Sequence, residues 1–329
     1  MEPIFTILLI VVFFAILILG HEAGHFLAAK LLRLEVKEFG LGLPPKIFSR
    51  KWRGTEYSIN AIPFGGFVKV PAINYATEDS LKTPAWKKVI VFISGGVMNF
   101  IIAWVAFIII FMVGTPRGVF VSAVLDNSPA EIAGLQAGDK LVGIDSITPF
   151  IDLVSESAGQ PIIFQVERQG VVLNIEAIPQ IDDDTHRIGV ELIEGGFPQK
   201  GFFDSLQHGF QSAWSFLTRI ITAFIAIFRY GNFSDAVGPV GIFSAVQVAH
   251  NLGIVYFLQL LGVVSLNLMV VNFFPLPALD GGHLLLIIAE KINKKPFSKK
   301  IIEHINSVSY ILLLILIFIV TIRDIIRLL

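Results

Sequence analysis

Cysteine is absent from this chain of 329 residues. Disulfide bonds and thiolate metal ligands are therefore excluded, and a metal ion would have to be held by histidine and carboxylate side chains. Charge is also scarce, because only 16% of the residues are charged and the formal net charge is −1. This charge balance gives no reason to expect nucleic acid as a partner.

The sequence instead contains several long apolar runs. The mean hydropathy of +0.74 is too high for an ordinary soluble domain. A helix needs about 20 apolar residues to cross about 30 Å of hydrocarbon, and four runs meet or approach this length: 4–32, 89–113, 252–274 and 308–329. We therefore predict a polytopic α-helical membrane protein with four transmembrane helices. The first run lacks a basic start and a cleavage site, which indicates a retained span and not a signal peptide.

The distribution of charge predicts the topology. Lysine and arginine are concentrated between the first two runs and again after the third, whereas acidic residues prevail between the second and the third. Basic loops stay on the cytoplasmic side of a membrane. We expect both termini, and the region between the second and third runs, to be extracytoplasmic.

One more apolar stretch lies within residues 202–230, where AWSFLTRIITAFIAIF carries Arg219 near its middle. If this stretch crossed the membrane, the two halves of the metal site predicted below would be directed to opposite faces. We therefore interpret residues 197–251 as an amphipathic or partly inserted helical segment on the outer side.

The loop between the first two runs contains YSINAIPFGGFVKV, which alternates apolar and polar residues on both sides of the turn-forming residues 63–66. This pattern predicts two short strands and a β-hairpin beside the cytoplasmic face of the membrane. It completes an N-terminal membrane half, residues 1–113. Residues 252–329 form the C-terminal half.

Residues 114–196 differ in kind, because VFVSAV, IIFQVER and VVLNIEAI alternate like strands. The string SPAEIAGLQAGDKLVGID resembles the core of a PDZ domain of the bacterial protease type, in which a short helix precedes a Gly-Asp turn into a buried strand. We expect a β-rich, extracytoplasmic PDZ domain here. A peptide-binding groove and a steric spacer are equally compatible with so compact a domain.

The motif HEAGH, residues 21–25, lies toward the cytoplasmic end of the first run. His21 and His25 are four residues apart, so on a helix they project from one face and can bind one metal ion. Glu22, next to His21, is placed to accept a proton from a metal-activated water. Ionisable residues in an apolar span are costly and functional by default, which disfavours a purely structural role.

A catalytic zinc site needs a third protein ligand. Asp280 is the best candidate, in NFFPLPALDGGH, where Pro275 and Pro277 break the third run and Gly281 and Gly282 allow another element to approach closely. His21 and Asp280 lie about 13 to 17 Å below the basic border, at 1.5 Å per helical residue, so the half-sites can meet. The alternative for Asp280 is a turn or cap aspartate.

Two further polar residues accompany Asp280. Asn272 is placed to hydrogen-bond the substrate backbone or the oxyanion, although an interhelical bond suits a buried asparagine as well. His283 is interpreted as interfacial in preference to a position beside the metal ligands.

Six motifs together resemble the bacterial site-2 protease family of intramembrane zinc metalloproteases over nearly the whole chain: HEAGH, PFGGFVKV, GGVMNF, the PDZ-like insert, GPVGI and NFFPLPALDGGH. In that family two histidines and the aspartate of LDG bind Zn²⁺, and the glutamate is the catalytic base. The resemblance therefore implies that His21, His25 and Asp280 are the zinc ligands and that Glu22 is the base.

The resemblance also implies a substrate and a location. Gly65, Gly66, Phe67 and Val68 of the hairpin would present an edge strand to an unwound substrate helix. The expected substrates are single-span membrane proteins, such as anti-sigma factors and remnant signal peptides, that another protease has already cut. The expected location is the bacterial inner membrane, with the active site toward the cytoplasm.

Two other functions compete with proteolysis. A non-catalytic membrane scaffold would use the PDZ domain to hold partners beside a vestigial metal site, but such a scaffold has no need of Glu22. A metal transporter would need a continuous polar path through the spans, for which the sequence offers few residues.

Overall fold

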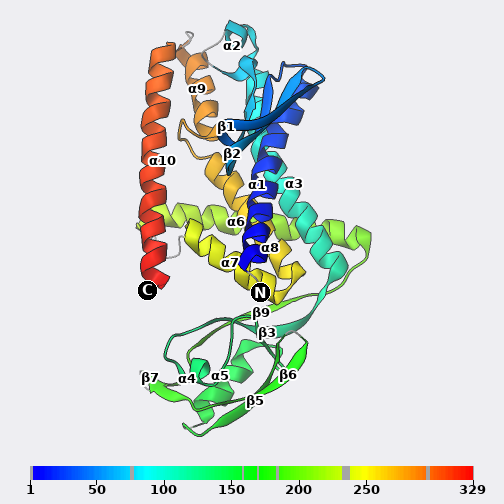
Figure 1. The fold of residues 1–329 in the computed structure, drawn as a ribbon, viewed down its shortest axis with the longest axis vertical. Coiled ribbons are helices and arrows are strands. Elements are labelled where there is room, and N and C mark those ends of the chain that lie inside the picture. Colours follow the sequence, from blue (N-terminus) through cyan, green and yellow to red (C-terminus); the bar gives the residue numbers. More distant parts are fainter. Residues whose placement is uncertain are drawn as a thin grey trace. The chain divides into compact units, whose positions relative to one another are not determined.

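The structure is a computed structural model that describes residues 3–74, 78–157, 159–168, 170–182, 185–231, 238–293 and 297–328 (Figure 1). Its helices are α1 (Pro3–Leu31), the 3-10 turn η1 (Pro71–Ile73), α2 (Glu78–Lys82), α3 (Ala85–Val113), α4 (Pro129–Ile132), α5 (Ile147–Glu156), α6 (Phe202–Tyr230), α7 (Pro239–Leu252), α8 (Ile254–Asn272), α9 (Asp280–Asn293) and α10 (Lys299–Leu328). Its strands are β1 (Glu38–Trp52), β2 (Thr55–Lys69), β3 (Thr115–Val124), β4 (Lys140–Leu141), β5 (Ile162–Arg168), β6 (Val171–Ala177), β7 (Gln180–Asp182), β8 (Thr185–Arg187) and β9 (Val190–Phe197).

The chain divides into two compact units. The first, called here the membrane unit, comprises Met1–Ala106, Phe210–Phe243 and Leu261–Leu329. The second, called the β unit, comprises Phe107–Gly209 and Ser244–Leu260.

Close packing of α1 against α3 organises the membrane unit. A Cβ built on Gly24 of α1 would lie 2.2 Å from the backbone oxygen of Ser94 in α3, so only glycine permits this approach. Ala28 and Ala29 continue the contact, and both are buried with Val91 of α3. Small residues therefore bring together the two helices that frame the site.

Five helices among the described residues are long and apolar enough to cross a membrane, and four of them correspond to the predicted runs: Leu8–Leu31, Ala85–Val113, Ile254–Asn272 and Lys300–Ile326. The chain is a multi-pass membrane protein. The fifth, Phe202–Ile227, coincides with the stretch that we interpret as amphipathic. In Figure 1, α6 lies across α1 and α10, and its Leu217 packs against Ala103 and Leu266. The crosswise direction favours a helix in the membrane plane, and the number of spans stays a prediction.

The loop after α1 forms a larger sheet than the predicted hairpin. β1 and β2 are joined at Arg53 and Gly54, whose positive φ angles of 46° and 79° are typical of a tight hairpin turn. Residues 38–41 pair with both 56–59 and 66–69. A β-hairpin is therefore present as predicted, but its turn lies at residues 53–54 and not at 63–66, because residues 38–41 lie between the two segments that were expected to pair.

The third predicted run is broken as its prolines indicate. α8 ends at Asn272, α9 begins at Asp280, and the intervening turn carries Pro275 and Pro277. Cβ atoms built on Gly281 and Gly282 would lie 2.2 and 2.1 Å from the backbone oxygens of Phe273 and Leu276. The expectation that a different element approaches these glycines is wrong, because the preceding turn of the same segment does so.

The β unit contains a five-stranded sheet in the order β6-β5-β4-β3-β9, with a buried core that includes Val121, Phe150 and Val166. The short helix α4 precedes Gly138 and Asp139, after which β4 begins. The guanidinium of Arg168 donates two hydrogen bonds of 2.7 Å to the buried carboxylate of Asp139. This turn into a strand matches the local structure predicted from the sequence, and the PDZ assignment stays a prediction.

Candidate metal centre

Helix α1 holds His21 and His25 on one face, one turn apart. Their ring centroids are 4.7 Å apart with an interplanar angle of 86°, and their Nε2 atoms are 3.1 Å apart. Two imidazole nitrogens of one helix thus converge on one point, as the four-residue spacing predicts.

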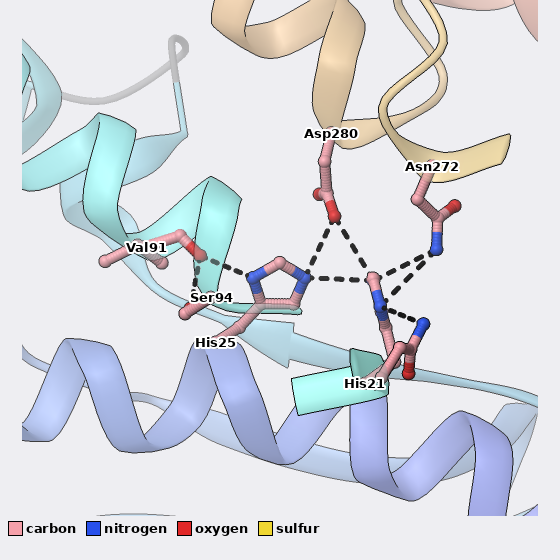
Figure 2. Close-up of polar contacts among 7 residues, drawn as sticks. His21, His25, Val91, Ser94, Asn272 and Asp280 are labelled. Carbon is pink, nitrogen blue, oxygen red and sulfur yellow. Dashed lines mark hydrogen bonds and ion pairs between the residues drawn. The ribbon is translucent and has the colours of Figure 1, made fainter. Parts of the chain in front are cut away.

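The N-terminal residue of α9 completes the group. Asp280 Oδ2 lies 3.2 Å from His21 Nε2 and 3.3 Å from His25 Nε2. Figure 2 shows the carboxylate pointing between the two rings. Side chains of α1 and α9, which are far apart in the sequence, therefore meet at one place.

The three atoms fit a zinc ion. Zinc–nitrogen and zinc–oxygen bonds of about 2.0–2.1 Å in a tetrahedron place neighbouring ligand atoms about 3.3 Å apart, close to the observed 3.1–3.3 Å. Asp280 Oδ2 is buried and accepts no hydrogen bond from the described residues. Such a buried acceptor facing two imidazole nitrogens is suited to a cation.

The imidazole of His25 is oriented by α3. Its Nδ1 lies 2.7 Å from the carbonyl oxygen of Val91, to which it donates a hydrogen bond (Figure 2). With the proton on Nδ1, the lone pair of Nε2 is directed at His21 and Asp280. Ser94 Oγ donates to the same carbonyl at 2.6 Å.

Space for both rings comes from Gly95 of α3. A Cβ built there would lie 2.5 Å from His25 Nε2 and 2.6 Å from His21 Cε1. Since no side chain fits at this distance, the glycine is required by the imidazoles and not by its backbone conformation. Gly95 is the first residue of the motif GGVMNF, which was noted in the sequence without a role assigned to this glycine.

Glu22 faces the strand segment 66–69 of β2. A Cβ built on Gly66 would lie 3.0 Å from Glu22 Cγ and 3.0 Å from Ile18 Cγ2, so the strand passes close over the base predicted from HEAGH. Glu22 also lines the same cavity as the three candidate ligands. The glutamate and the strand thus border one space.

That cavity has a volume of about 920 Å³ and lies within the membrane unit. One wall is the predicted edge segment, and Gly65, Gly66, Phe67 and Val68 all line it. Asn272 of α8 lines it too, with Nδ2 3.4 Å from both ring nitrogens of His21 (Figure 2). Every residue predicted for the site from the sequence is therefore found around this one cavity.

The cavity is also lined by residues that sequence reasoning missed. Glu303, Asn306 and Tyr310 of α10 line the cavity, and Asn306 Oδ1 is buried without a hydrogen-bond partner among the described residues. His283, interpreted above as interfacial, also lines it and stacks on Phe92 at 4.8 Å. The signal available for Asn306 was a lone asparagine just before the apolar run 308–329.

Comparison with known proteins agrees with the geometry. A family model described as Peptidase family M50 matches residues 9–316. "Putative zinc metalloprotease CPE1693" of Clostridium perfringens is 32% identical over 95% of this chain and 96% of its own length. A protein of the same description, CA_C1796 of Clostridium acetobutylicum, is 30% identical over 98% of both chains. "Regulator of sigma-W protease RasP" of Bacillus subtilis is 26% identical over 98% of this chain and 99% of its own length.

Proposed function

Because this chain belongs to peptidase family M50, the site-2 protease family, we propose that it is an endopeptidase that cuts single-span membrane proteins within their transmembrane segments. Membership establishes a membrane metalloprotease, and the relatives named as zinc metalloproteases imply that the metal is Zn²⁺. The position of the cut and the roles of individual residues belong to the proposal.

The observation that carries the proposal is the triangle of His21 Nε2, His25 Nε2 and Asp280 Oδ2, with sides of 3.1–3.3 Å. We assign these three residues as the zinc ligands. When bound, Zn²⁺ acts as a Lewis acid that makes water a competent nucleophile near neutral pH and polarises the carbonyl to be attacked. Three protein ligands leave the open position that catalysis requires.

Glu22 is the general base. Its carboxylate accepts a proton from the attacking water and returns it to the amine nitrogen of the leaving peptide. Being next to His21 in the helix, it borders the cavity from the side of the metal ligands. Because Glu22 accepts one proton and gives one proton back, its carboxylate is ionised again at the end of each turnover.

The substrate binds as an extended strand along residues 65–68 of β2. Residues 66–69 pair with 38–41 on one side and line the cavity with the other. Peptide bonds in a helix are already hydrogen-bonded, so a transmembrane substrate must unwind before attack, and strand addition replaces the lost hydrogen bonds. The amides of Asn272 and Asn306 are placed to bind the backbone of that strand or the oxyanion.

The β unit would control access as a PDZ domain outside the membrane, either as a steric filter or through a peptide groove. A filter admits substrates only after a first cut by another protease has removed a bulky outer domain. Anti-sigma factors and remnant signal peptides are the classes proposed, in a bacterial inner membrane with both termini outside. The name of the RasP relative, a regulator of sigma-W, supports the first class.

The test is cleavage of a single-span substrate by the full chain reconstituted in lipid vesicles. We expect wild-type protein to cut it, chelation to stop the reaction, and Glu22→Gln to slow it by about 10²–10⁴-fold, the usual contribution of acid–base catalysis. Glu22→Gln should still bind zinc, since its carboxylate is not among the three ligands. Undiminished cleavage by Glu22→Gln would contradict the mechanism and favour a site that acts elsewhere in the chain.

A further inference from the structure

A histidine that binds a metal through Nε2 carries its proton on Nδ1, and this proton needs an acceptor in a buried site. For His25 the acceptor is the carbonyl oxygen of Val91 at 2.7 Å. For His21 the neighbours of Nδ1 are amides, with Asn99 Nδ2 at 3.3 Å and Asn272 Nδ2 at 3.4 Å. In both contacts an amide NH₂ group faces the Nδ1–H of His21, and two donors cannot form a hydrogen bond. One of the two amides must therefore turn its oxygen toward Nδ1.

Asn99 of α3 is the residue whose oxygen is available. Its side chain is fully buried, and its Oδ1 has no hydrogen-bond partner among the described residues. The oxygen and nitrogen of an amide have almost the same shape, and a half turn of the amide exchanges them. After this turn, Oδ1 faces His21 Nδ1–H, and the orphaned acceptor and the unsatisfied donor satisfy each other.

Asn272 is less suited to this task. Its Nδ2 is equally distant, at 3.4 Å, from Nδ1 and Nε2 of His21, so it does not lie along the direction of either ring N–H bond. A hydrogen bond weakens steeply when it is bent in this way. Asn272 also lines the cavity, where a substrate would engage it.

The backbone of Asn99 is itself held in place. Its carbonyl oxygen accepts a hydrogen bond of 2.9 Å from Ser265 Oγ of α8, and Ser265 is fully buried. Gly95, which makes room for both imidazoles, lies one helical turn before Asn99 on the same helix. One face of α3 thus provides both the space and the acceptor for the histidines.

We propose that Asn99 is the positioning residue of His21, with its Oδ1 accepting the Nδ1–H hydrogen bond that fixes the ring for metal binding. This inference rests on the zinc site proposed above. The residue touches neither substrate nor metal and acts through His21 alone. Its counterpart for His25 is the carbonyl of Val91.

The experiment measures zinc affinity by competition with a chelator, using the full chain in detergent. Asn99→Leu keeps the volume and removes the acceptor, and it should weaken zinc binding by about 10–100-fold, as loss of such a partner typically does. Asn99→Asp keeps acceptor oxygens and removes the amide donor, so its zinc affinity should equal or exceed that of wild type. Asn272→Leu is the matched control and should leave zinc affinity unchanged.

The outcomes separate the two proposals. If wild type binds no zinc, the metal site itself is refuted, whatever Asn99 does. If wild type binds zinc but Asn99→Asp loses affinity, or Asn99→Leu keeps it, the role of Asn99 is refuted and the site stands. Should Asn99→Leu fail to fold, Asn99→Asp decides alone, because retained affinity supports an acceptor and lost affinity excludes it.

Discussion

Three buried polar side chains around the candidate metal position contact polar groups of other helices. His25 donates to a backbone carbonyl, Asp280 faces both imidazoles, and Asn99 contacts His21. In an apolar span an unsatisfied polar group costs several kcal/mol. Loss of one of these partners should therefore weaken metal binding, which makes metal content a sensitive readout.

Gly95→Ala tests how tightly α3 encloses the rings. The added Cβ would lie 2.5 Å from His25 Nε2, so the imidazoles must move away from their shared point. Overpacking of this kind costs about 1–3 kcal/mol, and 1.4 kcal/mol is tenfold in affinity. We expect zinc affinity to fall by about tenfold or more.

Zinc competition on purified protein measures this effect. The control is Gly201→Ala, where nothing lies within 4 Å of the added Cβ and no unusual φ is present. Wild-type affinity in Gly95→Ala would show that the rings do not occupy this position when they bind the metal.

The meeting of the three candidate metal ligands was predictable because two local patterns place them. The four-residue spacing in HEAGH fixes one face of a helix, and the prolines before LDGGH place Asp280 at the start of another. Asn99 was not predictable in this way. Its contact with His21 joins residues 78 positions apart, and nothing in the local spacing reports the distance between α1 and α3.

At the scale of the element, the β1–β2 sheet lines the cavity through residues 65–69 of β2. Alternation and turn residues in YSINAIPFGGFVKV revealed both strand segments, 56–59 and 66–69. The same pattern could not reveal that residues 38–41 pair between them. Strand register depends on partners far away in sequence, whereas alternation records only which face each side chain takes.

Gly66→Ala tests whether this sheet positions the base. The new Cβ would lie 3.0 Å from Glu22 Cγ, so either the strand or the glutamate must shift by a few tenths of an ångström. Small displacements of a reacting group can cost up to about 10²-fold in rate. We expect the turnover rate to fall by about tenfold with zinc affinity unchanged.

Cleavage rate and zinc content, measured on the same preparation, give the two values. A loss of zinc in parallel with rate would place the effect of Gly66 at the metal and not at Glu22. Full activity would mean that the strand does not constrain the base.

Glu38 ties the edge segment to the rest of the sheet. It accepts hydrogen bonds from Lys69 Nζ at 2.6 Å and from Ser58 Oγ at 2.8 Å, and forms an ion pair with Lys46 Nζ at 2.9 Å. Burial raises the pKa of its carboxyl group, but these partners outweigh burial and lower the pKa to about 2. The charged form is therefore stabilised by folding.

Glu38→Gln should lower the thermal unfolding temperature at pH 7. Because the pKa of Glu38 is lower in the folded state than the unfolded value of 4.5, the charged side chain stabilises the fold at pH values above 4.5. This stabilisation is lost as the pH falls from 4.5 toward 2. The difference between wild type and Glu38→Gln should therefore be smaller at pH 3 than at pH 7. Melting curves in detergent measure it, with the exposed Glu78→Gln as control. A difference that is equal or larger at pH 3 contradicts the assignment.

At the scale of the whole molecule, composition alone established the membrane class. Hydropathy and length located α1, α3 and α8 closely, since burial in lipid imposes the same requirement on every span, but α10 begins at Lys299 and not at the predicted residue 308. α6 was less accessible to this reasoning. An amphipathic helix in the membrane plane and a short span have similar composition, and only the direction of the helix separates them.

The central claim, that the bond is cut inside the membrane by the centre of His21, His25 and Asp280 with Glu22, is tested most directly by the masses of the products. A single-span substrate is incubated with the full chain in lipid vesicles, and the termini of both fragments are read by mass spectrometry. The account predicts new termini within the apolar span, present with wild type and absent with Glu22→Gln. New termini confined to the soluble flanks of the substrate, or equal amounts of product from Glu22→Gln, would contradict it.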